Sequence, residues 1–460
     1  MDTNSEKWSV LVVAAVTAFI TPFMGAAVTI ALPVIGHEFA MNAVLLGWVA
    51  NSFLLATAMF IMPFGRVADI YGRKKIFTYG ISIYILASFL SAIASSALVL
   101  IAFRVLQGIA CAMIYGTGVA ILMSVFPAGE RGKALGISVA ATYLGLSIGP
   151  FLGGVLTQHL GWRSVFYINI PLGLVVIALV FWKLKKEWFG AKGERFDTIG
   201  SVIFCLMLAA IMYGFSDLPA LLGGWLILIG IIGMVVFVKW EMKTEYPVFN
   251  IQIFRKNRVF TFSNIAALIN YSGTFAITFL LSLYLQYIKG CSPQTAGIIL
   301  IAQPLVMTLF SPAAGWLSDR MEPRIIASTG MAVMVIGLFL FAFLTARTSL
   351  VFIVADLLFL GFGYALFSSP NTNAVMSSVD KRFYGVASGT LGTMRVTGMT
   401  FSMAIAILVF AVYMGKVQIT PQNYPLFLKG VRVAFAIFSL LCFGGVWASL
   451  VRGKVHNDVH

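Results

Sequence analysis

The sequence predicts an all-α membrane protein, on the evidence of its composition, its apolar patterning and the placement of its charges. Apolar residues make up 60% of the 460 residues and charged residues only 10%, whereas about 25% of a typical soluble domain is charged. The apolar residues form one long run after another, and about 20 of them cross the core of a bilayer as a helix. Strands of a membrane β-barrel would alternate apolar and polar residues, and these runs do not alternate.

Fourteen runs are long enough to span a membrane, and short polar, basic or glycine- and proline-containing breaks separate them. The first run begins near Trp8, and its length indicates a spanning helix and not a cleavable signal peptide. The predicted cores, in order along the chain, are residues 9–34, 43–65, 76–95, 98–125, 134–157, 164–183, 197–216, 222–240, 259–285, 295–317, 325–346, 349–371, 383–413 and 430–451.

Lysine and arginine are concentrated in alternate loops. With the N-terminus inside, most of them fall on the cytoplasmic side, and the outer side carries only Arg163, Lys289, Arg347, Lys416, Lys429 and Arg432. This bias follows the positive-inside rule and requires an even number of spans. The net charge of +15 therefore reflects the orientation of the protein in the membrane and does not indicate nucleic-acid binding. We expect a multi-pass protein of the inner or plasma membrane, in contact with the lipid bilayer, with both termini cytoplasmic.

An internal repeat divides the chain. PFGRVADIYGR (63–73) matches PAAGWLSDRMEPR (312–324) in the order of its Pro, Gly, Asp and Arg residues, and LVLIAFR (98–104) matches LVFIVAD (350–356). Because both matches have an offset of about 250 residues, they predict a duplicated six-helix unit, which is the architecture of many transporters. We expect an N-terminal bundle over residues 1–188, two extra helices with flanking loops over 189–250, and a C-terminal bundle with a short tail over 251–460.

Several motifs resemble those of one transporter family. GRVADIYGRKK resembles the loop motif between the second and third helices of the major facilitator superfamily, RVLQG (104–108) resembles its fourth-helix motif, and GLSIGPFLGG (145–154) resembles its fifth-helix antiporter motif. GWRSVFYINIPLG (161–173), FDTIG (196–200) and LYLQYIKGCSPQTAG (283–297) resemble patches of its fourteen-helix drug:proton antiporter branch. The resemblance implies the major facilitator fold, with two six-helix bundles plus two extra central helices, and proton-coupled multidrug efflux.

The antiporter motif has a physical interpretation. Gly145, Gly149 and Gly153 recur every four residues and share one helix face with Gly154 beside it. Small residues at this spacing let two helices approach closely in lipid, and Pro150 favours a kink. The resemblance implies a helix at the interface between two rocking halves. Ordinary close packing is the alternative interpretation.

The loop motif places Gly65, Asp69, Gly72 and Arg73 at the cytoplasmic mouth. We expect a charge latch that holds helix ends together when the outside is open and breaks on inward opening. A plain basic loop under the positive-inside rule is the alternative. Asp319, in the second copy of the motif, is a candidate for a similar role.

Three charges lie within predicted spans. A charge in a membrane helix is a functional candidate because it is costly to insert. Arg104 and Asp356 occupy equivalent positions of the repeat, and helix rise places Arg104, Asp356 and Arg395 in one layer of the membrane. We expect Asp356 to be the main proton site, because burial favours its protonated form and a nearby arginine favours its carboxylate. A static ion pair with Arg395 is the alternative.

One departure from the family affects this hypothesis. The resemblance implies an acidic residue a few positions before an ALP triplet in the first helix, and Met24 occupies that position here. Cationic specificity and the coupling ion therefore stay open. The candidates for a substrate cavity are Met24, Asn51, Gln107, Tyr115, Asn270, Phe275 and Asn371, with Tyr271 among weaker ones; core or lipid-facing packing is the alternative for each aromatic residue.

The leading functional hypothesis is a proton-coupled secondary active transporter that exports small amphipathic or drug-like molecules by alternating access. A metabolite exporter, or an importer on the same fold with a different coupling ion, is the alternative that Met24 keeps open. A membrane enzyme would need clustered acids, histidines or metal ligands, and the four cysteines and four histidines are scattered. A channel often needs a ring of identical subunits. We expect a monomer that binds a small molecule and protons and has no enzyme activity, metal site, cofactor or nucleic-acid partner.

Overall fold

The structure is a computed structural model. It describes residues 3–127, 130–184, 186–249, 251–379, 384–415 and 417–453, apart from the side chains of residues 3–6, 131–133, 135 and 319. The elements, in order, are α1 (Thr3–Glu38), α2 (Ala43–Tyr71), α3 (Arg73–Ala92), α4 (Ala97–Val125), α5 (Arg131–Leu160), α6 (Arg163–Tyr167), α7 (Asn169–Lys183), α8 (Thr198–Asp217), α9 (Leu221–Glu241), α10 (Ile251–Lys256), α11 (Arg258–Thr274), α12 (Ala276–Leu283), η1 (Tyr284–Ile288), α13 (Pro293–Leu300), α14 (Ala302–Arg320), α15 (Pro323–Phe341), α16 (Leu350–Ser377), α17 (Tyr384–Tyr413), η3 (Pro421–Asn423) and α18 (Tyr424–Val451).

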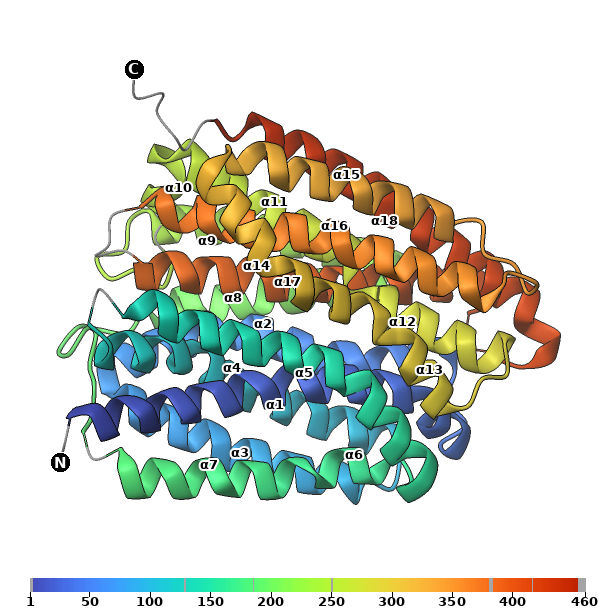
Figure 1. The fold of residues 1–460 in the computed structure, drawn as a ribbon, viewed down its shortest axis with the longest axis horizontal. Coiled ribbons are helices and arrows are strands. Elements are labelled where there is room, and N and C mark those ends of the chain that lie inside the picture. The colour runs from blue at the N-terminus through green and yellow to red at the C-terminus, as the bar shows by residue number, and fades with distance from the viewer. Residues whose placement is uncertain are drawn as a thin grey trace.

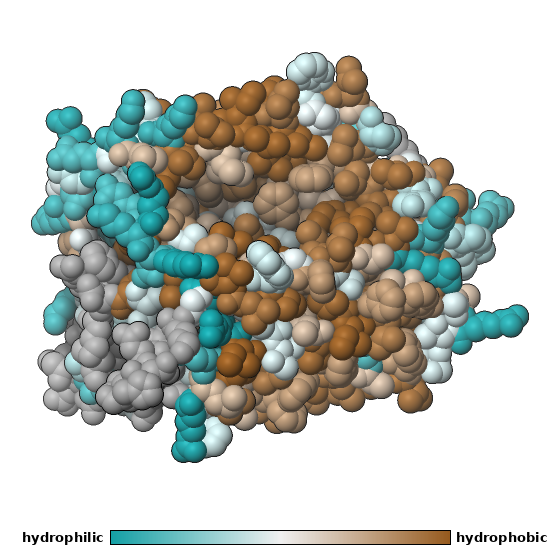
Figure 2. Space-filling view, turned by 90° about the horizontal axis from the view of Figure 1, so that it is seen from above, coloured by the Kyte–Doolittle hydropathy of each residue, from teal (hydrophilic) through white to brown (hydrophobic). Residues whose placement is uncertain are grey.

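These elements make up fourteen helices that are long and apolar enough to cross a membrane, and the described residues form no strand. The predicted all-α class and number of spans are therefore confirmed. Figure 2 shows on one face of the molecule a band of hydrophobic side chains between two hydrophilic ends. The protein is a multi-pass membrane protein, and this band is the surface that faces lipid.

The spanning helices form two halves that lie one above the other in Figure 1. The first half contains α1–α7 and the second contains α11–α18. In the first half, α4 packs against α2 and α3, and in the second half α16 packs in the same way against α14 and α15. We call the end where α1 begins and α18 ends the terminal end, and the other the far end.

Glycine contacts show that the two halves repeat one packing scheme. A Cβ on Gly80 of α3 would lie 2.8 Å from Met113 of α4, and a Cβ on Gly330 of α15 would lie 2.5 Å from the Gly363 carbonyl of α16. Both members of the second pair lie 250 residues after those of the first. Equivalent helices therefore approach each other closely at equivalent glycines, which supports the duplication that two short matches indicate in the sequence.

The extra pair, α8 and α9, joins the two halves on one side. Helix α8 packs against α2 of the first half and α17 of the second, and α9 packs against the outer side of α8. Most side chains of α9 are exposed, including Leu221, Trp225 and Ile229. Because α9 is also strongly apolar, this exposed surface suits lipid.

Side-chain caps fix where several helices begin. The Asn42, Ser96 and Ser349 side chains accept hydrogen bonds from backbone amides in the first turns of α2, α4 and α16. Such caps satisfy amides that have no partner inside the helix. The helix predicted over 325–346 ends earlier, at Phe341, because a turn follows in which the Thr345 amide donates to Thr348 Oγ1 at 2.8 Å.

Candidate functional site

Polar side chains from both halves meet near the middle of the molecule. The Tyr143 hydroxyl of α5 lies 3.0 Å from Ser368 Oγ of α16 and so links the halves. The rings of Tyr271 (α11) and Tyr364 (α16) meet edge to face, with centres 5.7 Å apart and an angle of 89°. The Arg395 guanidinium of α17 lies 5.8 Å from the centre of the Tyr271 ring. We call Tyr143, Tyr271, Tyr364 and Arg395 the tyrosine–arginine cluster.

Arg395 has few partners for an arginine inside a membrane protein. Its Nη2 donates to Thr372 Oγ1 at 2.6 Å, and its Nε is buried without a hydrogen-bond partner in the described part of the chain. The hydroxyl groups of Tyr271, Tyr143 and Tyr364 lie near it, and among the described residues no carboxylate forms an ion pair with it. Since a guanidinium carries five N–H donors, the cluster has positive charge and unused hydrogen-bonding capacity.

Arg104, in contrast, is held inside the first half. Its Nε donates to the Val49 carbonyl at 3.1 Å and its Nη1 to Gln107 Oε1 at 2.6 Å, and its guanidinium lies 4.4 Å from the centre of the Phe53 ring. Gln107 Nε2 in turn donates to Ser88 Oγ of α3 at 2.8 Å. Arg104 and Gln107 therefore tie α2, α3 and α4 together, which is a structural role.

Asp356 is buried in the second half with only 4% of its surface exposed. It packs against α15, where a Cβ on Gly337 would lie 2.9 Å from Asp356 Oδ1. Neither carboxylate oxygen has a hydrogen-bond partner in the described residues. A buried carboxylate without a partner is costly, so this site suits a carboxyl group that can take up a proton.

The three intramembrane charges do not share one layer, contrary to the expectation from the sequence. Arg395 bonds to Thr372 on α16, sixteen residues beyond Asp356 on the same helix, which is about 24 Å at 1.5 Å per residue. The alternative of a static Asp356–Arg395 ion pair is therefore wrong for this structure. The sequence estimate fails because it assumes a span of about 30 Å, whereas α17 continues for eighteen residues after Arg395, to Tyr413.

Several candidate cavity residues are enclosed within their own half. Met24 is fully buried, and the Asn169 side chain of α7 donates to its sulfur at 3.1 Å. Asn270 is also fully buried, with its Nδ2 3.5 Å from the sulfur of Met334 on α15. Both side chains contact a residue of their own half, so we assign them to packing.

Asn371 belongs to a polar clamp at the terminal end. Its Oδ1 accepts from Nη1 of the buried Arg452 at 2.9 Å, and its Nδ2 donates to the Ser263 carbonyl at 3.1 Å. Arg452 Nη2 also donates to the Pro323 carbonyl at 2.6 Å. These bonds join α11, α15, α16 and the end of α18, so Asn371 holds helices together.

The remaining candidates for the substrate cavity are Tyr115, Phe275 and Asn51, and each has different surroundings. The Thr21 hydroxyl donates to the Tyr115 hydroxyl at 2.9 Å, and Tyr115 interacts electrostatically with Tyr271 across the halves. Phe275 stands where α11 gives way to α12. Asn51 is fully buried on α2, and its side-chain amide has no hydrogen-bond partner in the described residues.

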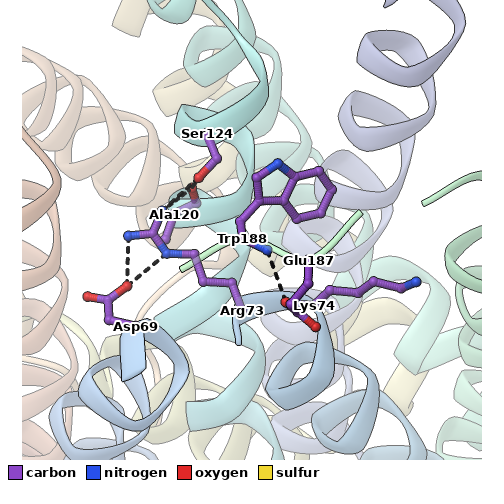
Figure 3. A network of polar contacts seen from close by, with 7 residues as sticks. All are labelled: Asp69, Arg73, Lys74, Ala120, Ser124, Glu187 and Trp188. Atoms are coloured by element: carbon purple, nitrogen blue, oxygen red, sulfur yellow. Dashed lines mark hydrogen bonds and ion pairs between the residues drawn. The ribbon is translucent and has the colours of Figure 1, made fainter. Parts of the chain in front are cut away.

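The gate motif forms a network at the terminal end of the first half (Figure 3). Arg73 Nε donates to Asp69 Oδ1 at 2.7 Å, and Arg73 Nη1 donates to Ser124 Oγ at 2.7 Å and to the Ala120 carbonyl at 3.2 Å. The ion pair therefore links the α2–α3 junction to α4. In this structure Asp69 is paired within its own half.

Gly72 lies where the chain turns between α2 and α3 with φ at 117°, a region that favours glycine. A Cβ there would also lie 2.7 Å from the Glu187 carboxyl carbon. The Glu187 carboxylate accepts from the Lys74 amide at 2.7 Å (Figure 3) and from the Lys75 amide at 3.2 Å. Glu187 thus caps the start of α3 from a distant segment.

The segment after α7 continues along this network. The amides of Gly190 and Ala191 both donate to the Asp69 carbonyl at 3.0 Å, and Arg66 forms an ion pair with Glu194. The sequence indicates the gate residues but not these partners, because the two segments are more than 110 residues apart.

The other gate residues lie at a helix crossing and at the second copy. Gly65 of α2 faces Gly116 of α4, and a Cβ on Gly116 would lie 3.1 Å from the Gly65 Cα. The side chain of Asp319 lies outside the described residues, so its proposed latch role stays a prediction.

The glycine row of the antiporter motif packs against α1. A Cβ on Gly149 would lie 2.7 Å from the Ala26 Cβ, and one on Gly153 would lie 2.6 Å from the Ala27 Cα. Gly145 similarly faces the Phe19 carbonyl. The regular row therefore serves close packing inside the first half.

The remaining motif residues contact the second half. A Cβ on Gly154 would lie 2.5 Å from the Pro293 carbonyl at the start of α13, and Gly297 of α13 faces the Pro150 carbonyl. Helix α5 thus has one face for α1 and another for α13. The motif lies at the junction between halves, as the resemblance implies, but through Pro150 and Gly154.

The far end carries most described hydrogen bonds between the halves. Ser282 Oγ donates to the Thr29 carbonyl and Gln286 Nε2 to the Ile30 carbonyl, both at 3.0 Å. Further links at this end are His159–Gln294, Gln158–Gln294, Tyr287–Pro33 and Gln418–Ala40. Near the middle, Ser147 and Thr308 add a contact of 3.3 Å to that of Tyr143. Between described residues, no side-chain hydrogen bond joins the two halves at the terminal end.

Tyr143 and Tyr364 are the central residues that the sequence analysis misses. A tyrosine in the middle of an apolar span is a signal in itself, because its hydroxyl needs a polar partner away from water. Tyr364 meets Tyr271 through helix packing within the second half, and Tyr143 joins them only where the two halves face each other. The one-dimensional pattern contains neither arrangement.

Comparisons with known proteins agree with this architecture. A model of the Major Facilitator Superfamily matches residues 14–403 and, in a second match, residues 263–458. The chain is 30% identical to the riboflavin transporter RibZ of Clostridioides difficile (strain 630) over 96% of both chains. It is also 30% identical to the multidrug resistance protein Stp of Mycobacterium tuberculosis (strain CDC 1551 / Oshkosh), over 84% of this chain and 73% of that protein.

The crystal structure of a D-xylose-proton symporter has the same fold, with a TM-score of 0.69, 13% identity and coverage of 98% of both chains. The chain therefore belongs to the major facilitator superfamily. It is a transporter with a small-molecule substrate, and not an enzyme.

Proposed function

We propose that this transporter exports small amphipathic or drug-like molecules in exchange for protons by alternating access. The observation that carries the proposal is the distribution of bonds between the halves. They lie at the far end and near the middle of the molecule, where Tyr143 of the tyrosine–arginine cluster makes one of them. This arrangement is expected of one state of a rocking transporter, in which one end is closed above a central site.

The direction of transport follows from charge and from the fifth helix. If basic loops face the cytoplasm, the terminal end is cytoplasmic, and the central site receives its substrate from inside the cell. The antiporter-type motif at Pro150 and Gly154 lies at the contact between halves and supports export. The relatives named for multidrug resistance and for riboflavin make planar drugs and riboflavin the first candidates for the cargo.

Asp356 is the proposed proton carrier. It is the one buried acid of the intramembrane charges, and its carboxylate has no partner in the described residues. Protonation would remove the cost of an unpaired buried charge, and release would follow when the site opens to water. Arg104 has too many bonds within its own half to act as the partner of Asp356.

Transport by purified protein in liposomes tests the proposal. We expect liposomes with an acidic lumen to take up riboflavin or ethidium in exchange for protons, and an ionophore that collapses the pH gradient should stop uptake. Asp356→Asn cannot carry a proton and should lose the pH-driven component. Asp217→Asn, at the end of α8, is the matched control and should keep it.

Two results would count against the proposal. Normal proton dependence in Asp356→Asn would exclude this residue as the carrier. Transport driven by a sodium gradient, or uptake that requires protons to move in the same direction as the cargo, would favour the importer or the different coupling ion. Met24 supports keeping that alternative, because the first helix has no carboxylate at this position.

A further inference from the structure

We propose that the tyrosine–arginine cluster binds planar aromatic molecules that are anionic or rich in hydrogen-bond acceptors, and discriminates against cations. The inference rests on the proposed function, because it assumes that the centre between the halves holds the cargo. It adds the chemical class of that cargo. The argument depends on the charge at the centre, on its aromatic surfaces and on its unused donors.

Charge comes first. Arg395 is the cationic member of the cluster, and the groups near it are the neutral hydroxyls of Tyr271, Tyr143 and Tyr364. Asp356 lies sixteen residues along α16 from the Arg395 contact at Thr372 and faces α15. In the described residues the positive charge of Arg395 therefore has no counter-ion.

Comparison with the other buried arginines shows that this is unusual for the molecule. Arg104 donates to a carbonyl and an amide oxygen and lies over the Phe53 ring, and Arg452 donates to a carbonyl, an amide oxygen and a hydroxyl. Arg395 makes one hydrogen bond, to a hydroxyl. A half-buried guanidinium with free donors is prepared for an external acceptor, since charge-assisted bonds to carboxylate-like oxygens are its strongest interactions.

Aromatic surfaces come from both halves. Tyr143 and Tyr115 belong to α5 and α4, whereas Tyr271 and Tyr364 belong to α11 and α16. Tyrosine rings offer faces on which flat rings stack and hydroxyls that donate or accept at the ring edge. An arginine beside them also stacks on aromatic planes. Such a set recognises a flat, conjugated molecule with polar edges better than a flexible aliphatic chain.

The cluster also lies where binding can affect the two halves. The Tyr143–Ser368 hydrogen bond crosses between them near the middle of the molecule. A ligand held between Tyr143 and Arg395 would contact both halves at once. The cluster, and not the region around Arg104 or Asp356, therefore determines which substrate the transporter binds.

Two dyes with the same xanthene ring system and opposite charge provide a direct test. Fluorescein is anionic and rhodamine 6G is cationic, and fluorescence anisotropy measures the binding of each to the full-length protein in nanodiscs, with empty nanodiscs as a blank. We expect fluorescein to bind tighter than rhodamine 6G by about tenfold or more, the order expected for one charge-assisted hydrogen bond.

Variants assign the preference to the cluster. Arg395→Gln should remove the preference for fluorescein, Arg395→Lys should keep part of it, and Arg347→Gln, in an exposed turn, should leave it unchanged. Tyr271→Leu should weaken binding of both dyes, whereas Tyr271→Phe keeps the ring and should bind them nearly as wild type does. Melting curves identify any variant that does not fold, and the comparison of dyes on wild-type protein needs no variant.

Equal or tighter binding of rhodamine 6G, or an unchanged dye preference in folded Arg395→Gln, would overturn the inference. The result is independent of the proposed function, because binding needs no gradient. Dye selectivity without proton-coupled transport would contradict the proposed function alone, and proton-coupled transport without dye selectivity would contradict this inference alone.

Discussion

At the scale of single residues, three arginines in the membrane-spanning bundles have different surroundings and therefore different roles. In the described residues, Arg104 and Arg452 each make two or more hydrogen bonds within their own half, although Arg452 Nε has no partner, whereas Arg395 makes one. The sequence analysis treats Arg104 and Arg395 alike, because a pattern registers only a costly charge in an apolar span, and Arg452 falls just after the last predicted span. The number of bonds each makes distinguishes a structural arginine from one available to a ligand.

Arg104 provides the residue-scale prediction. Arg104→Met should lower the free energy of unfolding by about 1–3 kcal/mol, because Gln107 Oε1 would be left buried without a donor and the Val49 carbonyl would lose its side-chain partner. Folded Arg104→Met protein should still show transport that depends on the proton gradient. Thermal melting in detergent and pH-dependent transport measure the two effects. Loss of proton coupling with unchanged melting would contradict a structural role and restore Arg104 as a coupling residue.

At the scale of elements, α5 presents different faces to its neighbours. Its row of glycines lies against α1, and Pro150 and Gly154 lie against α13. The spacing of four residues predicts the row and its close packing. It does not predict which neighbour the row meets, because spacing defines a face of one helix and says nothing about the order of helices around it.

A pair of matched substitutions on α5 tests this packing. Gly149→Ala should destabilise the protein by about 1–3 kcal/mol, because the new methyl group must displace the α1 backbone or the Ala26 side chain. Gly136→Ala on the same helix meets no atom within 4 Å and should be neutral or slightly stabilising, since alanine favours helices. Melting curves of the two variants give the comparison. Equal effects of the two changes would contradict the assigned packing.

Helix ends and breaks show where sequence prediction stops at this scale. Capping residues such as Ser96 and Ser349 mark starts that can be recognised in the sequence. The cap of α3 cannot be recognised in the sequence, because Glu187 reaches the start of this helix from the segment that follows α7. Long-range caps depend on tertiary structure, and a local pattern contains no trace of them.

At the scale of the whole molecule, the sequence predicts the architecture well and the central site poorly. Fourteen spans and the duplication follow from hydropathy and from two short matches, because lipid requires continuous apolar helices. The centre is assembled from α5, α11, α16 and α17, which belong to both halves. Tyr143 becomes a neighbour of Arg395 only when the halves dock, whereas Tyr364 and Arg395 belong to the same half.

The closed far end gives the whole-molecule prediction. Because Ser282 Oγ reaches the Thr29 carbonyl at 3.0 Å, cysteines at these two positions should be joined by a short, cleavable thiol cross-linker. In a background with the four native cysteines replaced by serine, the cross-link should stop transport, since the far end can no longer open. Cleavage of the linker should restore it.

A control pair at the same end separates this effect from general damage. Glu38 and Arg163 form an ion pair of 2.7 Å within the first half, so a cross-link between cysteines at these positions leaves the halves free to rock. We expect transport in liposomes to continue in this control. If protein cross-linked between Thr29→Cys and Ser282→Cys also transports at its full rate, the far end does not need to separate, and rocking of one half against the other is not how this chain moves its cargo.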